Sequence, residues 1–208
     1  SIDSVGGVVA TGEYEFGSTW DMGGVFDVNM TRRFVTRPYL PAALWDDKTA
    51  DIDTWPAIDD TNLDAVNAAL YVRSTLDNPS ASPTWTEWNE FSNAIVRGRG
   101  FQYKTIATTT NPDQNIVIEE LGSILELQQR VEQSSTLTSG AGTYTATFTD
   151  AFYQAPAIGL TGYNMGTGEY FQITNVTRTG FDVVFRNSGG TAVSRNFTYT
   201  AVGYGREI

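Results

Sequence analysis

Chemistry in this 208-residue chain must come from carboxylates, guanidinium groups, hydroxyls and aromatic rings, because the sequence contains neither cysteine nor histidine. Their absence removes thiolate nucleophiles, disulfide bonds, Ser-His-Asp triads and most zinc sites. Two close pairs of carboxylates, Glu87 with Glu90 and Asp51 with Asp53, have the residue types that supply the acid and base of a polysaccharide-degrading enzyme. Nothing else near these pairs supports such a site, so we expect a protein that is not an enzyme.

A cluster of aspartates lies between Trp45 and Asn62. Calcium prefers carboxylate and carbonyl oxygens, so this cluster is a candidate calcium site. Its spacing does not match an EF-hand loop, and a solvated acidic loop is the simpler interpretation. We therefore expect no metal and no other cofactor, with calcium as the alternative. The aspartates are Asp46, Asp47, Asp51, Asp53, Asp59 and Asp60.

Aromatic rings beside planar polar groups indicate saccharide binding, because the ring stacks on the apolar face of a sugar and the polar groups bind its hydroxyls. Asp182 and Arg186 are expected on one strand face, where a surface or intersubunit ion pair is the simpler interpretation. Trp85 and Trp88 have the same stacking capacity, although tryptophan more often serves packing. The candidate glycan-binding residues in the last third of the chain are Tyr153, Tyr163, Asn164, Tyr170, Asp182, Arg186 and Asn187.

Charge divides the chain into two parts. The net charge is −11, which disfavours nucleic acid as a partner. Residues 1–133 hold 20 acidic and 9 basic side chains and all five tryptophans, whereas residues 134–208 hold four of each charge. We therefore predict two domains, 1–133 and 134–208, with the boundary near Gln133 to Ser135. No apolar run approaches the ~20 residues of a membrane helix, so we expect no membrane insertion.

The elements that must position the candidate residues are strands. In residues 169–187, EYFQITNVTRTGFDVVFRN, polar and apolar residues alternate with a period of two, which is typical of a half-buried antiparallel sheet. Phe171, Phe181 and Phe185 are predicted to lie in the core. Gly180 is predicted at the reversal between the two strands, where glycine tolerates a positive φ.

Similar patterns predict strands along the rest of the chain. In the first part they cover 13–16, 24–34, 65–74 and 99–105, with a turn at the Gly23-Gly24 pair. Residues 115–131 fit a helical face and a long strand equally. In the second part five to six strands fit in about 75 residues, with a hairpin turn at 187–190. The predicted fold is all-β, with two antiparallel β-sandwich domains.

The first part resembles tail proteins of tailed bacteriophages. Four segments carry the resemblance: 70–74, TWTEWNEF (84–91), RGFQYK (99–104) and NIVIEELGSI (115–124). The resemblance implies a jelly-roll-like β-sandwich, similar to discoidin or carbohydrate-binding modules. It also implies that 115–131 is mainly strand.

The second part resembles the C-terminal domain of phage tail fibre and tip proteins, and also the H-type lectin module. The resemblance rests on Phe148, Phe152 and Pro156, followed by the string NVT-x-TGF from Asn175 to Phe181. It implies a six-stranded antiparallel sandwich that assembles as a trimer and binds galactose-type sugars between subunits. Some of those lectins use a histidine at the sugar, and this chain has none, so the resemblance implies no particular sugar specificity.

Together these resemblances imply a receptor-binding or tail-tip fibre module of a virion, acting outside the cell at the host surface. The expected partners are two further copies in a homotrimer, other phage tail proteins, and a host surface polysaccharide or receptor. Weak single sites repeated by symmetry would then gain avidity. The alternative is a purely structural trimeric fibre or knob that does not bind glycan itself.

Overall fold

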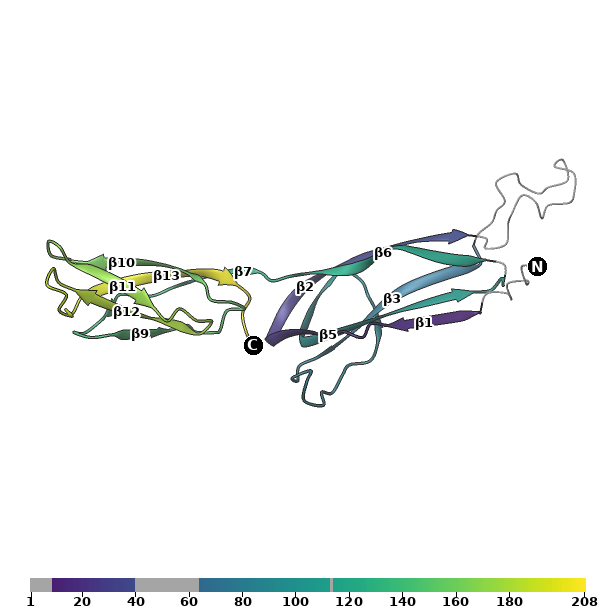
Figure 1. Ribbon diagram of the computed structural model, residues 1–208, viewed down its shortest axis with the longest axis horizontal. Coiled ribbons are helices and arrows are strands. Elements are labelled where there is room, and N and C mark those ends of the chain that lie inside the picture. Colours follow the sequence, from purple (N-terminus) through teal and green to yellow (C-terminus); the bar gives the residue numbers. More distant parts are fainter. Residues whose placement is uncertain (1–8, 40–63, 113) are drawn as a thin grey trace, which may run out of the picture.

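The computed structural model describes residues 9–39, 64–112 and 114–208 (Figure 1). Strands and their connections make up these ranges, and all paired strands are antiparallel, which confirms the all-β prediction. None of the described residues forms a helix that could cross a bilayer. Figure 1 shows two units placed end to end, with β1 to β6 in the first and β7 to β13 in the second.

The first unit contains one antiparallel sheet in the order β4-β3-β5-β2-β6, with β1 also paired to β5. Strand β3 occupies one edge of β5, so β1 and the first half of β2 share the other edge. They do not overlap there, because each pairs with a different part of β5. The second half of β2 pairs with β6. The strands are β1 (Thr11–Glu15), β2 (Trp20–Tyr39), β3 (Val66–Thr75), β4 (Asn89–Glu90), β5 (Ala94–Thr109) and β6 (Asn115–Glu126).

This sheet folds over itself to enclose a core. Strand β6 contacts β3, although β5 and β2 lie between them in the sheet order. Phe34 of β2 and Leu125 of β6 pack on the core from the folded-over side. The alternation expected from the sequence is clear in β2, where every second residue from Met22 to Met30 is buried. The core residues are Met22, Phe26, Val28, Met30, Leu70, Val72, Phe91 and Phe101.

The turn predicted at Gly23-Gly24 is wrong, because the chain continues there as part of β2. The register of β2 against β5 shifts between Asp21 and Phe26, which marks an irregularity of the β-bulge type. Gly23 has a φ of 74°, and its N–H donates to the Asp21 carboxylate at 2.8 Å. Glycine is suited to this conformation because it has no Cβ.

The second unit is a sandwich of two sheets, ordered β10-β13-β7 (with β8 also on β13) and β11-β12-β9. Strands β7 and β8 both pair with the edge of β13 that lies away from β10. They therefore fill one strand position, and the unit has the six positions expected. The strands are β7 (Gln129–Gln133), β8 (Leu137–Thr138), β9 (Tyr144–Thr147), β10 (Ala157–Tyr163), β11 (Tyr170–Thr174), β12 (Gly180–Arg186) and β13 (Asn196–Tyr204).

The pairing of β7 places the change of unit earlier than the boundary expected near Gln133. Residues 129–133 pair with β13 and so belong to the second unit. The ambiguous segment 115–131 consists of strand β6 and the start of β7, with the chain passing between units at Leu127 and Gln128. Composition does not reveal this earlier boundary, because residues 129–133 include the charged residues Arg130 and Glu132 and so continue the charged composition of the first unit.

The hairpin of β11 and β12 matches the expected alternation with two corrections. Phe181 and Phe185 are buried, but Phe171 is 36% exposed, because β11 is an edge strand of its sheet. Gly180 does not have a positive φ; that conformation belongs to Asn175, with a φ of 50°. Gly180 is needed for close packing instead, since a Cβ there would lie 2.2 Å from the carbonyl oxygen of Ala146 on β9.

Candidate functional site

Three of the seven predicted glycan-binding residues share one surface, the outer side of the β11-β12-β9 sheet. Tyr170 on β11 lies directly opposite Arg186 on β12. Asp182 is four residues before Arg186 on the same side of β12, opposite Thr174. The Tyr170 ring is 42% exposed. An exposed ring with a guanidinium and a carboxylate nearby is an arrangement that can bind a hydroxylated ligand. We call this surface the polar face.

Two charged groups of the polar face already have partners inside the chain. Asp182 accepts hydrogen bonds from Thr145 Oγ1 at 2.6 Å and from Asn175 Nδ2 at 2.7 Å. These bonds, that from Thr145 first, lower the pKa of the Asp182 carboxyl. Arg186 donates to the Gly190 carbonyl at 2.8 Å. Asp182 and Arg186 therefore do not form an ion pair with each other within one copy, since they are four residues apart along one strand.

Tyr163 and Asn164 lie elsewhere. Tyr163 is the last residue of β10, and its hydroxyl is 3.1 Å from Thr198 Oγ1 on β13. It points to the outer side of the other sheet, away from the polar face. Asn164 follows with a φ of 53° and begins the turn into β11. These two residues do not join Tyr170 in a single site within one copy of the chain.

The contacts of Asn187 and Tyr153 are internal. Asn187 Oδ1 accepts the N–H groups of Gly189 and Thr191 at 3.0 Å, so it shapes the β12–β13 turn. The Tyr153 ring packs edge-on against Phe26 of the first unit, with the ring centroids 5.7 Å apart. Both side chains therefore make contacts that stabilise the fold.

An ion pair that the sequence did not reveal organises the loops at the far end of the second unit. The Glu169 side chain is only 9% exposed and accepts hydrogen bonds from Arg195 Nε and from the Gly166 N–H, both at 2.7 Å. These bonds, that from Arg195 first, lower the pKa of the Glu169 carboxyl. The pair joins the β10–β11 loop to the β12–β13 loop. Its only sequence signal was two isolated charges in otherwise uncharged loops.

The outer side of the β10-β13-β7 sheet carries no charged residue, and we call it the uncharged face. Strand registers place the side chains of β7, β8, β10 and β13 on it in alternation. Val131, Tyr163 and Tyr204 are 55%, 40% and 57% exposed. Its residues are Gln129, Val131, Gln133, Thr138, Ala157, Gly159, Thr161, Tyr163, Asn196, Thr198, Thr200, Val202 and Tyr204.

Trp85 and Trp88 of the first unit are engaged by neighbouring cations. The Arg73 guanidinium lies 5.3 Å from the Trp85 ring centroid and 4.4 Å from that of Trp88, and Lys104 Nζ lies 5.0 Å from Trp88. Such contacts are favourable cation–π interactions. Packing is therefore the role that these rings have in the structure.

The aspartates proposed for calcium, and the pair Asp51 and Asp53, lie outside the described residues. Within ranges 9–39, 64–112 and 114–208, no group of three acidic side chains is arranged to hold a metal ion.

Comparison of this chain with protein-family models, with curated proteins and with solved structures gives no match. The function must therefore be argued from the surfaces themselves.

Proposed function

We propose that this chain is a receptor-binding module of a phage tail tip or tail fibre, which attaches to host surface glycan as a homotrimer. The observation that carries the proposal is the difference between the two faces of the second unit. The polar face presents Tyr170 and Gln172 to solvent, with the half-buried Arg186 beside them. The opposite, uncharged face presents apolar, hydroxyl and amide side chains.

Self-association is best served by the uncharged face. Copies that each carry a net charge of −11 repel one another, and burying unpaired charges between them is costly. A face without charges avoids both penalties. Packing three copies through their uncharged faces would leave three polar faces pointing outward. Three weak glycan sites on one particle would then bind a cell surface with avidity.

In this proposal the acidic first unit contacts other tail proteins, and the second unit faces the host. The assembly would be part of the virion and would act outside the cell. The end-to-end arrangement of the units in Figure 1 suits this division, because it places the β10–β11 and β12–β13 loops at the end remote from the first unit.

Association is tested first, by mass photometry of the 22.8 kDa chain. Thr200→Glu puts a charge in the middle of the uncharged face and is expected to give monomers. Thr174→Glu, on the outer side of β11, is the matched control and should remain trimeric. A wild-type protein that is monomeric at micromolar concentration would contradict the trimer.

Glycan binding is tested with the trimer on whole host cells and on a glycan array. Tyr170→Ala is expected to reduce binding by about tenfold or more, because it removes the only strongly exposed ring described on the polar face. Tyr14→Ala, which removes a still more exposed tyrosine in the first unit, is the control and should bind normally. A trimer that binds neither cells nor their polysaccharide would overturn the proposal.

That last outcome would favour a second candidate, a structural trimeric fibre or knob. The observation on its side is that Asp182 and Arg186 already make internal hydrogen bonds. A structural module would form the trimer and lose it with Thr200→Glu, but would be indifferent to Tyr170→Ala.

A further inference from the structure

One edge of β2 is only partly covered by a neighbouring strand. Strand β5 pairs with this edge as far as Met30, which lies opposite Ala94. Strand β6, on the other edge of β2, continues the sheet to Tyr39. In the described part of the chain, no strand pairs with the β5 side of β2 beyond Met30. Unpaired strand edges of this kind can bind an added strand.

Alternation identifies the main-chain groups that face this free edge. The Arg32 N–H points away from β6, because it donates to the Asn93 side chain at 2.8 Å. Every second residue of a strand directs its N–H and C=O groups to the same side, so those of Phe34 and Thr36 also face the free edge. Asn93 closes the edge at one end, and Pro38, which has no N–H, closes it at the other. The edge therefore offers the main chain of two residues.

A groove of about 650 Å³ opens beside the free edge. Phe34 is half-buried and packs on the first core, and Phe91 on the facing segment is only 1% exposed. The Phe91 N–H donates to the Leu70 carbonyl at 2.7 Å, so this wall is held in place before any ligand arrives. The groove thus combines unpaired main-chain groups with two aromatic rings. Its lining residues are Arg32, Phe34, Glu90, Phe91, Ser92 and Asn93.

Arg32 gives the groove a positive group without an ionic partner. Its neighbour on β2, Arg33, pairs with Glu120 at 3.8 Å. Arg32 is exposed, its guanidinium lies 6.0 Å from the Phe34 ring centroid, and no carboxylate of the described ranges pairs with it. Glu90, from β4, makes the lining neutral overall and disfavours a ligand with more than one negative charge. A ligand with a single carboxylate fits these charges.

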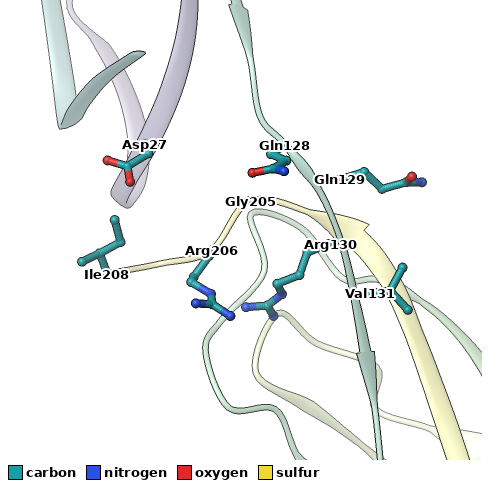
Figure 2. A pocket seen from close by; sticks show the side chains of 8 residues that line it. All are labelled: Asp27, Gln128, Gln129, Arg130, Val131, Gly205, Arg206 and Ile208. Atoms are coloured by element: carbon teal, nitrogen blue, oxygen red, sulfur yellow. The ribbon is translucent and has the colours of Figure 1, made fainter.

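The hollow between the two units differs in this respect, and Figure 2 shows the side chains that line it. Its two guanidinium groups, of Arg130 and Arg206, are already next to the Asp150 carboxylate, at N–O distances of 3.7 and 3.1 Å. Glu132 lies 3.6 Å from Arg130 as well. A carboxylate from outside would have to displace these partners, whereas Arg32 has none to displace.

We propose that the groove beside β2 binds the C-terminal segment of another protein chain as an added antiparallel strand. An added strand cannot continue past Asn93, so it must end or turn away beside Arg32. An antiparallel strand brings its carboxyl end to this point, whereas a parallel strand would bring an amino end, which the guanidinium repels. The unpaired guanidinium therefore selects a chain that ends there.

The contacts of such a segment follow from antiparallel pairing. The last residue would lie opposite Phe34, donating its N–H to the Phe34 carbonyl and accepting the Phe34 N–H at its carboxylate. Arg32 would pair with the same carboxylate. The side chain of the last residue would be apolar, because it lies on the same side as the Phe34 ring. The residue two positions earlier would pair with the main chain of Thr36.

The test is isothermal titration calorimetry of the full chain with the peptide acetyl-Thr-Val-Thr-Val, whose last residue carries a free carboxylate. Saturable binding is expected. The same peptide with a C-terminal amide should bind about tenfold more weakly, because the charge-assisted bond to Arg32 is lost. Methylation of the last N–H should weaken binding about fivefold or more, because the bond to the Phe34 carbonyl is lost.

Arg32→Gln should weaken binding of the free acid about tenfold and leave binding of the amide unchanged. Arg33→Gln is the matched control, because this next residue of β2 faces the opposite side of the sheet, and it should bind like the wild type.

Absence of saturable binding would overturn the site. Equal binding of the acid and the amide, or wild-type binding by Arg32→Gln, would overturn the carboxylate assignment. Unchanged binding of the methylated peptide would overturn strand addition. The groove is on the first unit, whereas Tyr170 and Thr200 are on the second, so these results and those of the glycan and association experiments are independent.

Discussion

Phe26→Ala should separate the two units as well as destabilise the first. Phe26 is fully buried in β2, at the edge of the first core. Its ring meets Tyr153 edge-on, at an interplanar angle of 84°, and lies 5.9 Å from the Arg178 guanidinium. A Cβ on Gly205 would be only 3.1 Å from the same ring. One side chain therefore contacts both units.

The expected loss follows from these contacts. Burial of a phenylalanine contributes about 2 kcal/mol, and the cavity left by its ring raises the cost of Phe→Ala to about 3–5 kcal/mol. Of this, the edge-to-face pair with Tyr153 supplies about 1 kcal/mol, and the Arg178 contact supplies about 0.5–1 kcal/mol. The contacts at the junction thus account for about 1.5–2 kcal/mol, a little under half of a loss of about 4 kcal/mol.

Urea denaturation and limited proteolysis measure the two parts. Phe26→Ala should lower the free energy of unfolding of the first unit and speed cleavage near Leu127 and Gln128. The control is Phe197→Ala, which is equally buried but contacts only Tyr144, Phe185 and other residues of the second unit. It should cost a similar amount without exposing the crossing. A loss below about 1 kcal/mol for Phe26→Ala, or unchanged cleavage, would refute the reasoning.

Three further predictions concern the second unit. Gly180→Ala should destabilise it by about 2–3 kcal/mol in chemical denaturation, because the new Cβ would collide with the Ala146 carbonyl oxygen; a neutral effect would show that the strands can separate freely. Arg195→Ala should speed hydrogen exchange in the β10–β11 loop by releasing Glu169, and unchanged exchange would deny the ion pair that role. Asp182→Asn should be less stable than wild type at pH 7, and the difference should shrink as the pH falls below 3.8. The lowered pKa of Asp182 stabilises the fold above its ordinary value of 3.8, and that contribution disappears as the pH falls through the folded pKa; a constant difference would contradict this assignment.

Sequence alone predicted most of the strands and part of the core, because alternation is a local property. Phe181 and Phe185 were placed correctly in the interior. Phe171 was not, because its exposure depends on β11 being an edge strand, and edges are set by strand order rather than by local pattern. The role of Gly180 was missed for a similar reason: its close neighbour, the Ala146 carbonyl, is on another strand.

Residues at the candidate sites were harder to place. Tyr170, Asp182 and Arg186 do share a face, as period-two alternation required. Tyr153 was grouped with them by residue type, but its partner Phe26 comes from the other unit. The pairing of Glu169 with Arg195 and the bond from the Ile208 N–H to the Val25 carbonyl both join distant segments. Such contacts exist only once the topology is known.

The double connection between the units has a mechanical consequence. Domains joined by one linker can pivot about it, but here the chain leaves the first unit through Gln128 and returns to hydrogen-bond Val25 through Ile208. Two separated attachments resist bending in the plane that contains them. A sideways load on the loops at the far end would therefore reach the first unit as a torque on β2, whose 20 residues run from the junction into the first unit's sheet. The two units would therefore transmit such a load as one stiff rod, with little bending at the junction.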